Sequence, residues 1–368
     1  MSDTTKQYWM EVLAQTTKAF NLCANMAVEQ NIPLGIKSFH DNLYDVIRQN
    51  FPIIPAQGAI KVYKEVLSAL RSRKSNKHFN GNIPQRKKLA LHLDKRMYSK
   101  LSKEGIALSS GVLNKRELCT FNLYDKVIEL FDTCSTADPL LFARDGKIYL
   151  SVPFEVSTPP CTNDEALGVD LGVRRLFVTS EGNSFVDKRY LKRRRELRYL
   201  KRCLQSNGSR SAKKHLRTLS QKEYHMSKDM QHRAAKALIE STSASHIILE
   251  DLKNLKQTTS KTSEGHKRTK HNRVLSQVPF ASFKDILTHK AQLVGKQVET
   301  VSPTWTSQTD SRTNKRDGER CGCRYYCSDG VVLDADWNAA VNIANRANHP
   351  KSSCLPIDGG LKPLLGWL

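Results

Sequence analysis

The first part of the chain has the spacing of hydrophobic residues that is typical of helices. Apolar side chains recur three or four positions apart in QYWMEVLAQTTKAFNLCANMAVEQ, and again in QGAIKVYKEVLSALRSR. Pro55 stands just before the second of these segments, where a proline is well tolerated because the first turn of a helix needs no N–H donor there. We therefore predict a helical region over residues 1–82.

The pattern changes after Ile83. The segments LALHL, ELCTFNLY and KIYLSVPFEV alternate or run as strands do between Gly, Asn and Asp turns, so they predict a small β module over residues 83–160. The stretch STPPCTND, Ser157 to Asp164, is typical of a linker. The basic segment around Phe79 has two interpretations: a loop that follows a nucleic-acid backbone and stacks on a base, or a solvated linker.

In the second half of the chain, predicted strands alternate with predicted helices. EALGVDLGVRRLFVTSEGNSF, SASHIILEDL and QVETVSP have strand patterns, whereas FASFKDILTHKAQLVGKQV has helical spacing. VVLDADWNAAVNIANRANH predicts a helix that begins at or just after Asp336. This alternation favours an α/β fold with a mixed sheet, in which residues 161–305 form the core, 306–333 an insertion and 334–368 the end of the core and a tail.

Within that core, residues 186–240 predict a basic helical hairpin, interrupted at SNGS. Like charges one turn apart destabilise a helix unless an anion screens them, so we expect phosphate contacts rather than only a solvated face. The candidate contacts are Lys192, Arg193, Arg194, Arg195, Arg198, Lys201, Arg202, Lys213, Lys214 and Arg217.

Net charge supports a nucleic-acid partner. The chain has 59 Lys and Arg against 36 Asp and Glu, a formal net charge of +23. Such an excess repels itself unless a polyanion neutralises it. The polar, basic segment Lys256 to Arg273 is a further candidate lid or contact. Because the chain shows neither a membrane-spanning run nor a signal peptide, we expect a cytoplasmic protein, and nothing indicates an obligate protein partner.

Three acids stand out by their positions. Asp170 lies inside an apolar strand, Glu250 ends a middle strand and Asp336 stands at the start of a late helix. Strand ends and helix starts can meet at one edge of a mixed sheet, and magnesium prefers carboxylate oxygens. Two Mg²⁺ ions held in this way would suit phosphodiester hydrolysis. Taken singly, the same acids could be a turn former, an edge residue and a helix cap.

The motifs of the second half resemble the TnpB (OrfB-type) nucleases of insertion sequences, which are related to miniature type V CRISPR effectors. The resemblance covers residues 168–347 and rests on GVDLGV, IILEDL, FASFKDILTHKAQLVG, VSPTWTSQ and DADWNAAVNIA. In the first half, only KIYLSVPFEV and IPQRKK are similar to the family's β wedge region.

The resemblance implies an RNase H-like (RuvC) nuclease core with a helical recognition region and a β wedge module. It implies a magnesium-dependent DNA endonuclease with a transposon-derived guide RNA and a double-stranded DNA target. The positions of the family's three metal-binding acids correspond to Asp170, Glu250 and Asp336. Asp251 and Asp334, which lie close to them in the sequence, are alternative candidates. The front half would recognise a short duplex motif while base pairing recognises the target sequence.

The cysteines depart from this family. Of nine cysteines, six are scattered and interpreted as single residues, and three are clustered: Cys321, Cys323 and Cys327. The family has a four-cysteine zinc ribbon here, but this chain has Asp310, Thr313, Tyr326 and Asp329 near the expected positions. We therefore expect a degenerate, metal-free ribbon. The alternative is Zn²⁺ held by the three thiols with Asp310 or Asp329 as a fourth ligand.

Two alternative functions stay open at this point. A cleavage-deficient, repressor-like descendant would bind DNA through its RNA without cutting it. The presence of all three acids argues against this hypothesis, and the altered cysteines favour it. An RNase H-like transposase or resolvase would act without RNA, and a lack of copurifying RNA would favour it.

Overall fold

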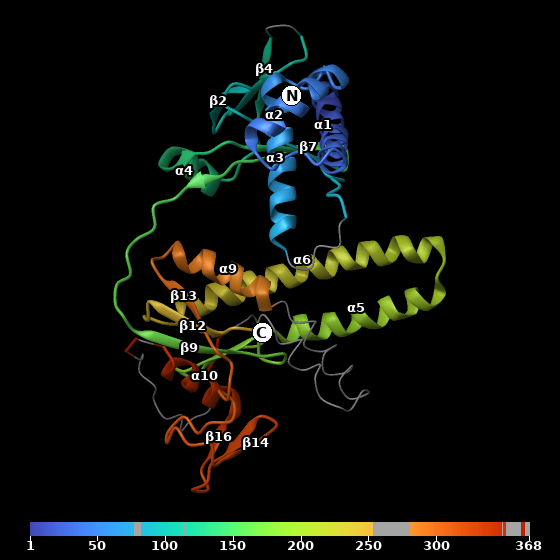
Figure 1. The fold of residues 1–368 in the computed structure, drawn as a ribbon. Coiled ribbons are helices and arrows are strands. Elements are labelled where there is room, and N and C mark those ends of the chain that lie inside the picture. The colour runs from blue at the N-terminus through green and yellow to red at the C-terminus, as the bar shows by residue number, and fades with distance from the viewer. Residues whose placement is uncertain (77–81, 113–114, 253–279, 348, 351–361, 365–368) are drawn as a thin grey trace. The chain divides into compact units, whose positions relative to one another are not determined.

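The computed structural model describes residues 1–76, 82–112, 115–252, 280–347, 349–350 and 362–364. For residues 362–364 only the backbone is described. The chain folds into two compact units, Met1–Val156 and Ser157–Leu368 (Figure 1). The boundary falls immediately before the stretch that we predicted as a linker. The segments around Phe79 and from Lys256 to Arg273, which we considered as nucleic-acid contacts, lie in part or entirely outside the described residues.

Three helices begin the first unit: α1 (Asp3–Glu29), α2 (Ile36–Asn50) and α3 (Ala56–Ser75). Pro55 is the N-cap residue of α3, as its position in the sequence suggested. Cys23, Phe39 and Val66, one from each helix, belong to a common buried core. The helical periodicity of the opening segment therefore arises from faces that pack against each other.

The rest of this unit is mainly β structure. Short antiparallel strands pair in the orders β1-β6-β7, β2-β3-β4 and β5-β8. Their bounds are β1 (Leu89–His92), β2 (Tyr98–Ser102), β3 (Gly105–Ser109), β4 (Arg116–Thr120), β5 (Ser135–Thr136), β6 (Leu140–Arg144), β7 (Lys147–Ser151) and β8 (Phe154–Glu155). Trp9 of α1 is fully buried among these strands, and its indole N–H donates to the carbonyl of Ser109 at 2.9 Å.

One element of this module was not predicted. β4 ends at Thr120, and helix α4 (Asp125–Thr133) follows it where we expected only strands. The spacing of Val127, Ile128 and Phe131 is helical over barely two turns, too short to be distinguished from the alternating pattern around it. The ring of Phe131 packs against Phe121 and Phe154, so tertiary contacts stabilise this short helix.

A six-stranded mixed sheet organises the second unit, in the order β13-β12-β9-β10-β11-β17. β9 runs parallel to β12 and antiparallel to β10. The strands are β9 (Ala166–Leu171), β10 (Phe177–Thr179), β11 (Asn183–Phe185), β12 (His246–Glu250), β13 (Gln297–Val301) and β17 (Lys362–Leu364). The mixed sheet expected from the sequence is thus confirmed.

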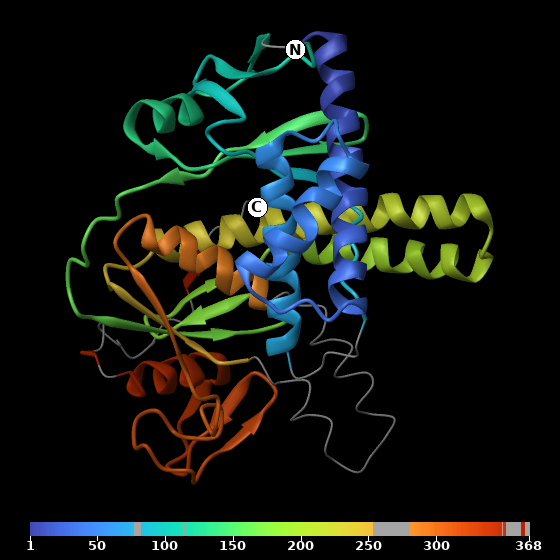
Figure 2. The same cartoon turned by 45° about the horizontal axis from the view of Figure 1, so that its top comes forward.

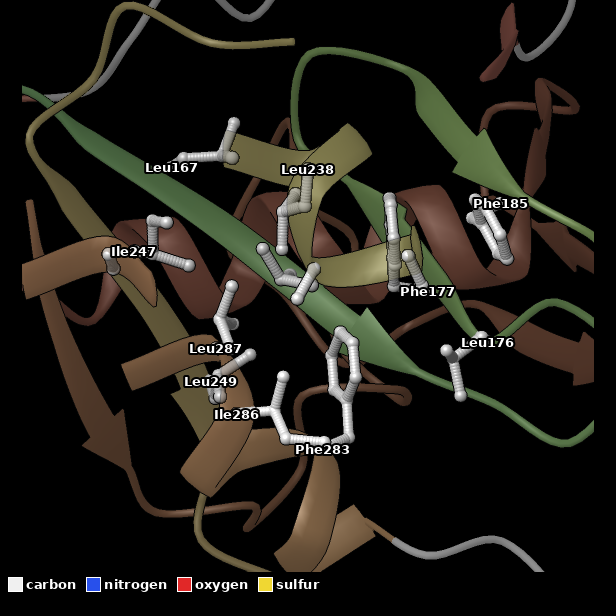
Figure 3. Close-up of a cluster of buried hydrophobic side chains, with 14 of the residues drawn as sticks. Leu167, Leu176, Phe177, Phe185, Leu238, Ile247, Leu249, Phe283, Ile286 and Leu287 are labelled. Atoms are coloured by element: carbon white, nitrogen blue, oxygen red, sulfur yellow. The ribbon is translucent and has the colours of Figure 1, made fainter. Parts of the chain in front are cut away.

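Helices cover both faces of this sheet (Figures 1 and 2). On one face lie α6 (Arg210–Glu240) and α9 (Phe280–Gln292), and on the other lies α10 (Ala335–Asn345). Figure 3 shows the core of the first face, where Phe177, Leu249 and Phe283 meet. On the second face, Ile343 of α10 packs against Ala166 and Ile248.

Gly168 in GVDLGV allows α10 to lie very close to β9. A Cβ atom at this position would be 2.0 Å from the carbonyl oxygen of Ala340 and 2.5 Å from the amide nitrogen of Ala344. Both of these atoms are helix backbone, so a side chain here could be accommodated only by moving α10. This glycine therefore sets the distance between β9 and α10.

Two smaller features complete the unit. Helix α5 (Lys188–Asn207) pairs with α6 in a long hairpin, and the turn between them has Gly208 at φ 66° (Figure 1). A three-stranded antiparallel sheet of β14 (Glu319–Cys321), β15 (Arg324–Tyr326) and β16 (Val332–Asp334) precedes α10. Across the described part of the chain, no helix has the length and apolar character needed to cross a membrane.

Candidate active site

The strand register brings two of the three predicted acids side by side. β12 pairs with β9 so that Leu249 is opposite Val169, and both side chains are buried on the face covered by α6 and α9. Because side chains alternate along a strand, the next residues, Glu250 and Asp170, face the other side. Both acids therefore stand at the carboxyl ends of adjacent parallel strands, on the face covered by α10.

Helix α10 carries the third acid to this face. It begins at Ala335, slightly earlier than predicted, because the carboxylate of Asp334 accepts hydrogen bonds from the backbone N–H groups of Asp336 and Trp337. Asp334, one of the alternative candidates, is thus the N-cap residue, and Asp336 lies in the first turn. The helix-cap explanation considered for Asp336 applies instead to Asp334.

The other two acids act electrostatically on Asp170. Burial raises the pKa of Asp170 well above its ordinary value, and the charges of Glu250 and Asp336 raise it further. Burial also raises the pKa of Glu250, against the effect of a hydrogen bond from Thr306. The site is therefore electrostatically strained in its fully ionised form and favours added positive charge.

Two arginines, which sequence reasoning missed, supply part of that charge. Arg175 donates to Asp336 from Nε at 3.0 Å and from Nη2 at 2.6 Å, and it also pairs with Asp334 at 2.8 Å. Arg320, from β14, donates to the other oxygen of Asp336 at 2.8 Å. Arg175 follows the first predicted strand and Arg320 adjoins the cysteine cluster, so no local pattern linked either of them to the acids.

Buried amides fix the loop that contacts Glu250. Asn342 donates to the carbonyls of Thr306 and Thr309 at 2.9 and 2.7 Å, and Asn338 donates to Thr309 at 2.7 Å. The hydroxyl of Thr306 in turn donates to the carboxylate of Glu250. The asparagines of WNAAVNIA and the threonine of VSPTWTSQ, motifs noted in the sequence, thus form one hydrogen-bonded support for the site.

The residues present fit magnesium by their chemistry. Three carboxylates offer the hard oxygen ligands that Mg²⁺ prefers, and the raised pKa of Asp170 reflects a cluster that a cation would stabilise. The three acids are not, however, among the groups whose ligand atoms all lie within 4.8 Å of one another in the described residues. Binding of two ions would therefore require side-chain adjustment, including partial release of Asp336 from Arg175 and Arg320.

The predicted zinc ligands are arranged differently from a ribbon site. Cys321 and Cys323 are exposed, whereas Cys327 is buried. The two carboxylates considered as a fourth ligand, Asp310 and Asp329, are both paired with Arg312, each at 2.9 Å. Neither is therefore available as a borrowed zinc ligand in this arrangement.

Cys327 has an environment that opposes zinc binding. Its thiol hydrogen-bonds to the carboxylate of Asp310, and burial together with that neighbour raises its pKa to about 11. Zinc binds the thiolate, so an ion here would have to displace the thiol proton of Cys327. An ion-pair network centred on Arg312 thus joins positions near those where the family carries its cysteine pairs.

The basic hairpin presents most of its predicted contacts to solvent. Arg194 differs: it is only 8% exposed and lies over the ring of Tyr190. Lys201 differs too, because it is half-buried and paired with Glu223. We assign these two to holding the hairpin together. The exposed residues are Lys192, Arg193, Arg195, Arg198, Arg202, Lys213, Lys214 and Arg217.

Comparison with known proteins places this geometry in context. A family model described as "Probable transposase" (OrfB_IS605) matches residues 149–259, and one described as "Cas12f1-like, TNB domain" matches residues 280–343. The chain is 28% identical over 128 residues to the CRISPR-associated endodeoxyribonuclease Cas12f2 of Micrarchaeota archaeon (strain CG1_02_47_40). The aligned region covers 32% of this chain and 23% of that protein.

A second relative matches over a longer stretch. The chain is 24% identical over 251 residues to the CRISPR-associated endodeoxyribonuclease Cas12f1 of Syntrophomonas palmitatica, covering 55% of this chain and 49% of that protein. The chain thus matches less than half the length of either curated relative. Among solved structures, the cryo-EM structure of a Cas12f1–sgRNA–target DNA complex superposes with a TM-score of 0.61 at 13% identity, over 94% of this chain and 83% of that one.

The structural match establishes the fold, and the two family models cover most of the region in which the sequence motifs lie. The mixed sheet carries GVDLGV and IILEDL on adjacent parallel strands, with the helix of DADWNAAVNIA against them. We conclude that the chain is TnpB-like in sequence over these residues and shares the fold of the miniature type V effector Cas12f1.

Proposed function

We propose that this protein is an RNA-guided DNA endonuclease. Its catalytic carboxylates, which hydrolyse phosphodiester bonds of the target, would be Asp170, Glu250 and Asp336. The observation that carries the proposal is the placement of Asp170 and Glu250 at the ends of adjacent parallel strands, with Asp336 in the first turn of the helix that packs on the same face. Burial and the two neighbouring acids raise the pKa of Asp170, so a cation would stabilise this group of carboxylates. The nuclease names of the two curated relatives support the same activity.

The roles of the chain's own residues follow from their contacts. Asp170, Glu250 and Asp336 would hold two Mg²⁺ ions, which when bound supply an activated water and stabilise the leaving oxygen. Thr306 orients Glu250 through its hydroxyl, and α10 holds Asp336 against β9. Arg175 and Arg320 contact Asp336 directly and so restrain that carboxylate at the edge of the site.

A guide RNA and a double-stranded DNA target are the partners that we propose. The solved structural neighbour is a complex with sgRNA and target DNA. In this chain, the exposed cations of the α5–α6 hairpin supply positive charge for phosphate backbones. Base pairing would then provide sequence recognition, while the protein contacts the backbone.

The decisive experiment expresses the chain with its native flanking DNA, sequences the copurified RNA and tests cleavage of a guide-matched duplex with Mg²⁺. A defined RNA, with cleavage that Asp170→Ala abolishes without loss of the RNA, would support the proposal. Defined RNA with binding but no cleavage would favour the repressor-like alternative. Cleavage without any bound RNA would favour an RNA-independent transposase or resolvase.

The hairpin assignment is tested by charge reversal. We expect the triple variant Arg193→Glu, Arg195→Glu and Arg198→Glu to weaken RNA binding and to reduce the slope of log affinity against log salt by about 2 to 3, because each lost phosphate contact removes roughly 0.7 to 0.9. Fluorescence anisotropy over a salt series measures this slope.

Arg194 provides a matched control within the same helical turn. Because Arg194 is buried, Arg194→Gln should lower the thermal midpoint while leaving the salt slope unchanged. A triple variant with the wild-type slope, or an Arg194→Gln variant with a reduced one, would contradict the division between exposed and buried cations.

A further inference from the structure

A second cluster of potential ligands lies at the opposite end of the same strands. Asp164 precedes β9, His246 is the first residue of β12, and His349 follows α10. In the described residues, these three form the group whose ligand atoms all lie within 4.8 Å of one another. Glu250 ends the strand that His246 begins, so the cluster is roughly 13 Å from the predicted catalytic acids along β12.

The two histidines share both of their carboxylate neighbours. Their rings are stacked, with centroids 3.7 Å apart and an interplanar angle of 16°. On one side, Asp164 Oδ1 lies 3.2 Å from His246 Nε2 and 2.8 Å from His349 Nδ1. On the other side, Glu299 Oε1 lies 3.0 Å from His246 Nδ1 and 3.1 Å from His349 Nε2.

This pattern cannot be satisfied by two neutral imidazoles alone. Each neutral ring has one N–H donor and one lone pair, yet both nitrogens of His349 and Nδ1 of His246 are hydrogen-bonded to carboxylate oxygens, which only accept, and His246 Nε2 lies 3.2 Å from another. If the N–H groups point to Glu299, the lone pairs of His246 Nε2 and His349 Nδ1 both face Asp164. Three electron-pair donors then lie within 4.8 Å of one another, as the ligands of a metal site do, although the stacked rings would have to tilt apart for both lone pairs to point at one ion.

The surrounding backbone holds the three ligands in place. The carbonyl of Pro350, next to His349, accepts a hydrogen bond from the N–H of Ala166 at 2.7 Å. The side-chain Oδ1 of Asn163, next to Asp164, accepts from the backbone N–H of Ser245 at 3.0 Å, and Ser245 adjoins His246. Each ligand therefore stands beside a residue that is held by a hydrogen bond to the backbone of a neighbouring segment.

We infer that Asp164, His246 and His349 bind one divalent transition-metal ion of the zinc class, with Glu299 as the carboxylate that orients both rings. Imidazole nitrogens suit zinc and its neighbours, whereas magnesium takes oxygen ligands. Two ligands each about 2.1 Å from an ion at a tetrahedral angle lie about 3.4 Å apart. The nitrogen–oxygen separations of 2.8 and 3.2 Å are short of that value, so binding would move the ligands outward and tilt the two stacked rings apart.

The ion would act as a structural link. It would join the segment after α10 to the starts of β9 and β12, and so clamp the helix that carries Asp336 onto the sheet. Such a site is independent of the proposed nuclease activity, because its ligands lie at the other end of β12 and its occupancy can be measured without nucleic acid.

The test is metal content of the full-length chain after chelator treatment, addition of Zn²⁺ and dialysis. We expect one equivalent of zinc per chain, lost in His349→Gln and in Asp164→Asn, both of which replace partly exposed side chains. His289→Gln, an exposed histidine on α9, is the matched control and should retain the ion. Zinc should raise the thermal midpoint of the wild type by about 5 °C at a hundredfold excess over the dissociation constant.

A second variant separates this site from the cysteines. The triple variant Cys321→Ser, Cys323→Ser and Cys327→Ser should still bind one equivalent of zinc per chain. Co²⁺ bound to the wild type should lack the charge-transfer absorption of thiolate ligands. Loss of zinc in the cysteine variant, or retention in His349→Gln, would overturn the assignment. A wild type that retains no zinc would also overturn it and would indicate that protons alone satisfy the two rings.

Discussion

Replacing Asp170 by asparagine is expected to reduce DNA cleavage by at least about 10³-fold while raising the thermal midpoint of the metal-free protein. The loss of activity follows because a neutral amide cannot replace a carboxylate that holds Mg²⁺, an interaction worth several kcal/mol. The gain in stability follows because the pKa of Asp170 is raised by burial and by Glu250 and Asp336. Ionised Asp170 therefore destabilises the fold at neutral pH, and asparagine removes that charge. Single-turnover cleavage and thermal unfolding in a chelator measure the two effects.

The stability effect has a defined dependence on pH. A carboxyl group with a raised pKa in the folded state costs stability once the pH exceeds its unfolded pKa, and the cost grows until the folded pKa is passed. The advantage of Asp170→Asn should therefore be present at neutral pH and vanish in acid, where the wild-type carboxyl is protonated in both states. Asp251→Asn is the matched control, expected to cleave normally. An active Asp170→Asn, or an inactive Asp251→Asn, would contradict the site assignment.

The second large effect is expected at Gly168. Alanine there would place its Cβ 2.0 Å from the carbonyl oxygen of Ala340 and 2.5 Å from the amide nitrogen of Ala344. Since α10 must move outward, we expect a loss of about 3 kcal/mol in the free energy of unfolding and a fall of roughly 6 to 12 °C in the thermal midpoint. Cleavage should fall as well, because α10 carries Asp336. Denaturant unfolding and the cleavage assay measure these changes.

Gly35 offers the control for this substitution. It precedes α2 with φ −117°, and an added Cβ would meet only the hydroxyl of Ser38 at 3.5 Å, an ordinary contact. Gly35→Ala should therefore leave both stability and cleavage close to those of the wild type. If Gly168→Ala were tolerated equally well, the close approach of α10 to β9 would not be what positions Asp336.

The region of residues 306–333 is held in place by interactions that do not involve its cysteines. Arg312 pairs with Asp310 and Asp329, two residues that lie close to the positions of the family's cysteine pairs. Asn338 also anchors this region to α10, since its side-chain oxygen accepts from the backbone N–H of Ser311 at 2.8 Å. The three-stranded sheet that follows delivers Arg320 to Asp336. The region thus retains a structural connection to the predicted catalytic acids.

The sequence by itself determined most of the elements and predicted the three candidate acids. Helical periodicity, strand alternation and glycine turns are local properties, so they predicted the opening helices and the strands that carry Asp170 and Glu250. Motif order singled out Asp336 over Asp334, and the structure then gave Asp334 a capping role. The short helix α4 escaped prediction because two turns of amphipathic pattern are too little to outweigh the strands around them.

Only the tertiary structure decided which side chains meet. Arg175 and Arg320 reach Asp336 across 161 and 16 residues of chain, and Arg194 is buried while its neighbours Arg193 and Arg195 are exposed. The cluster of Asp164, His246 and His349 joins residues up to 185 positions apart. Such contacts depend on strand register, helix packing and rotation of each side chain, none of which leaves a periodic trace in the sequence. The sequence predicted the carboxylate chemistry of the candidate site, whereas the fold determined which residues surround and support it.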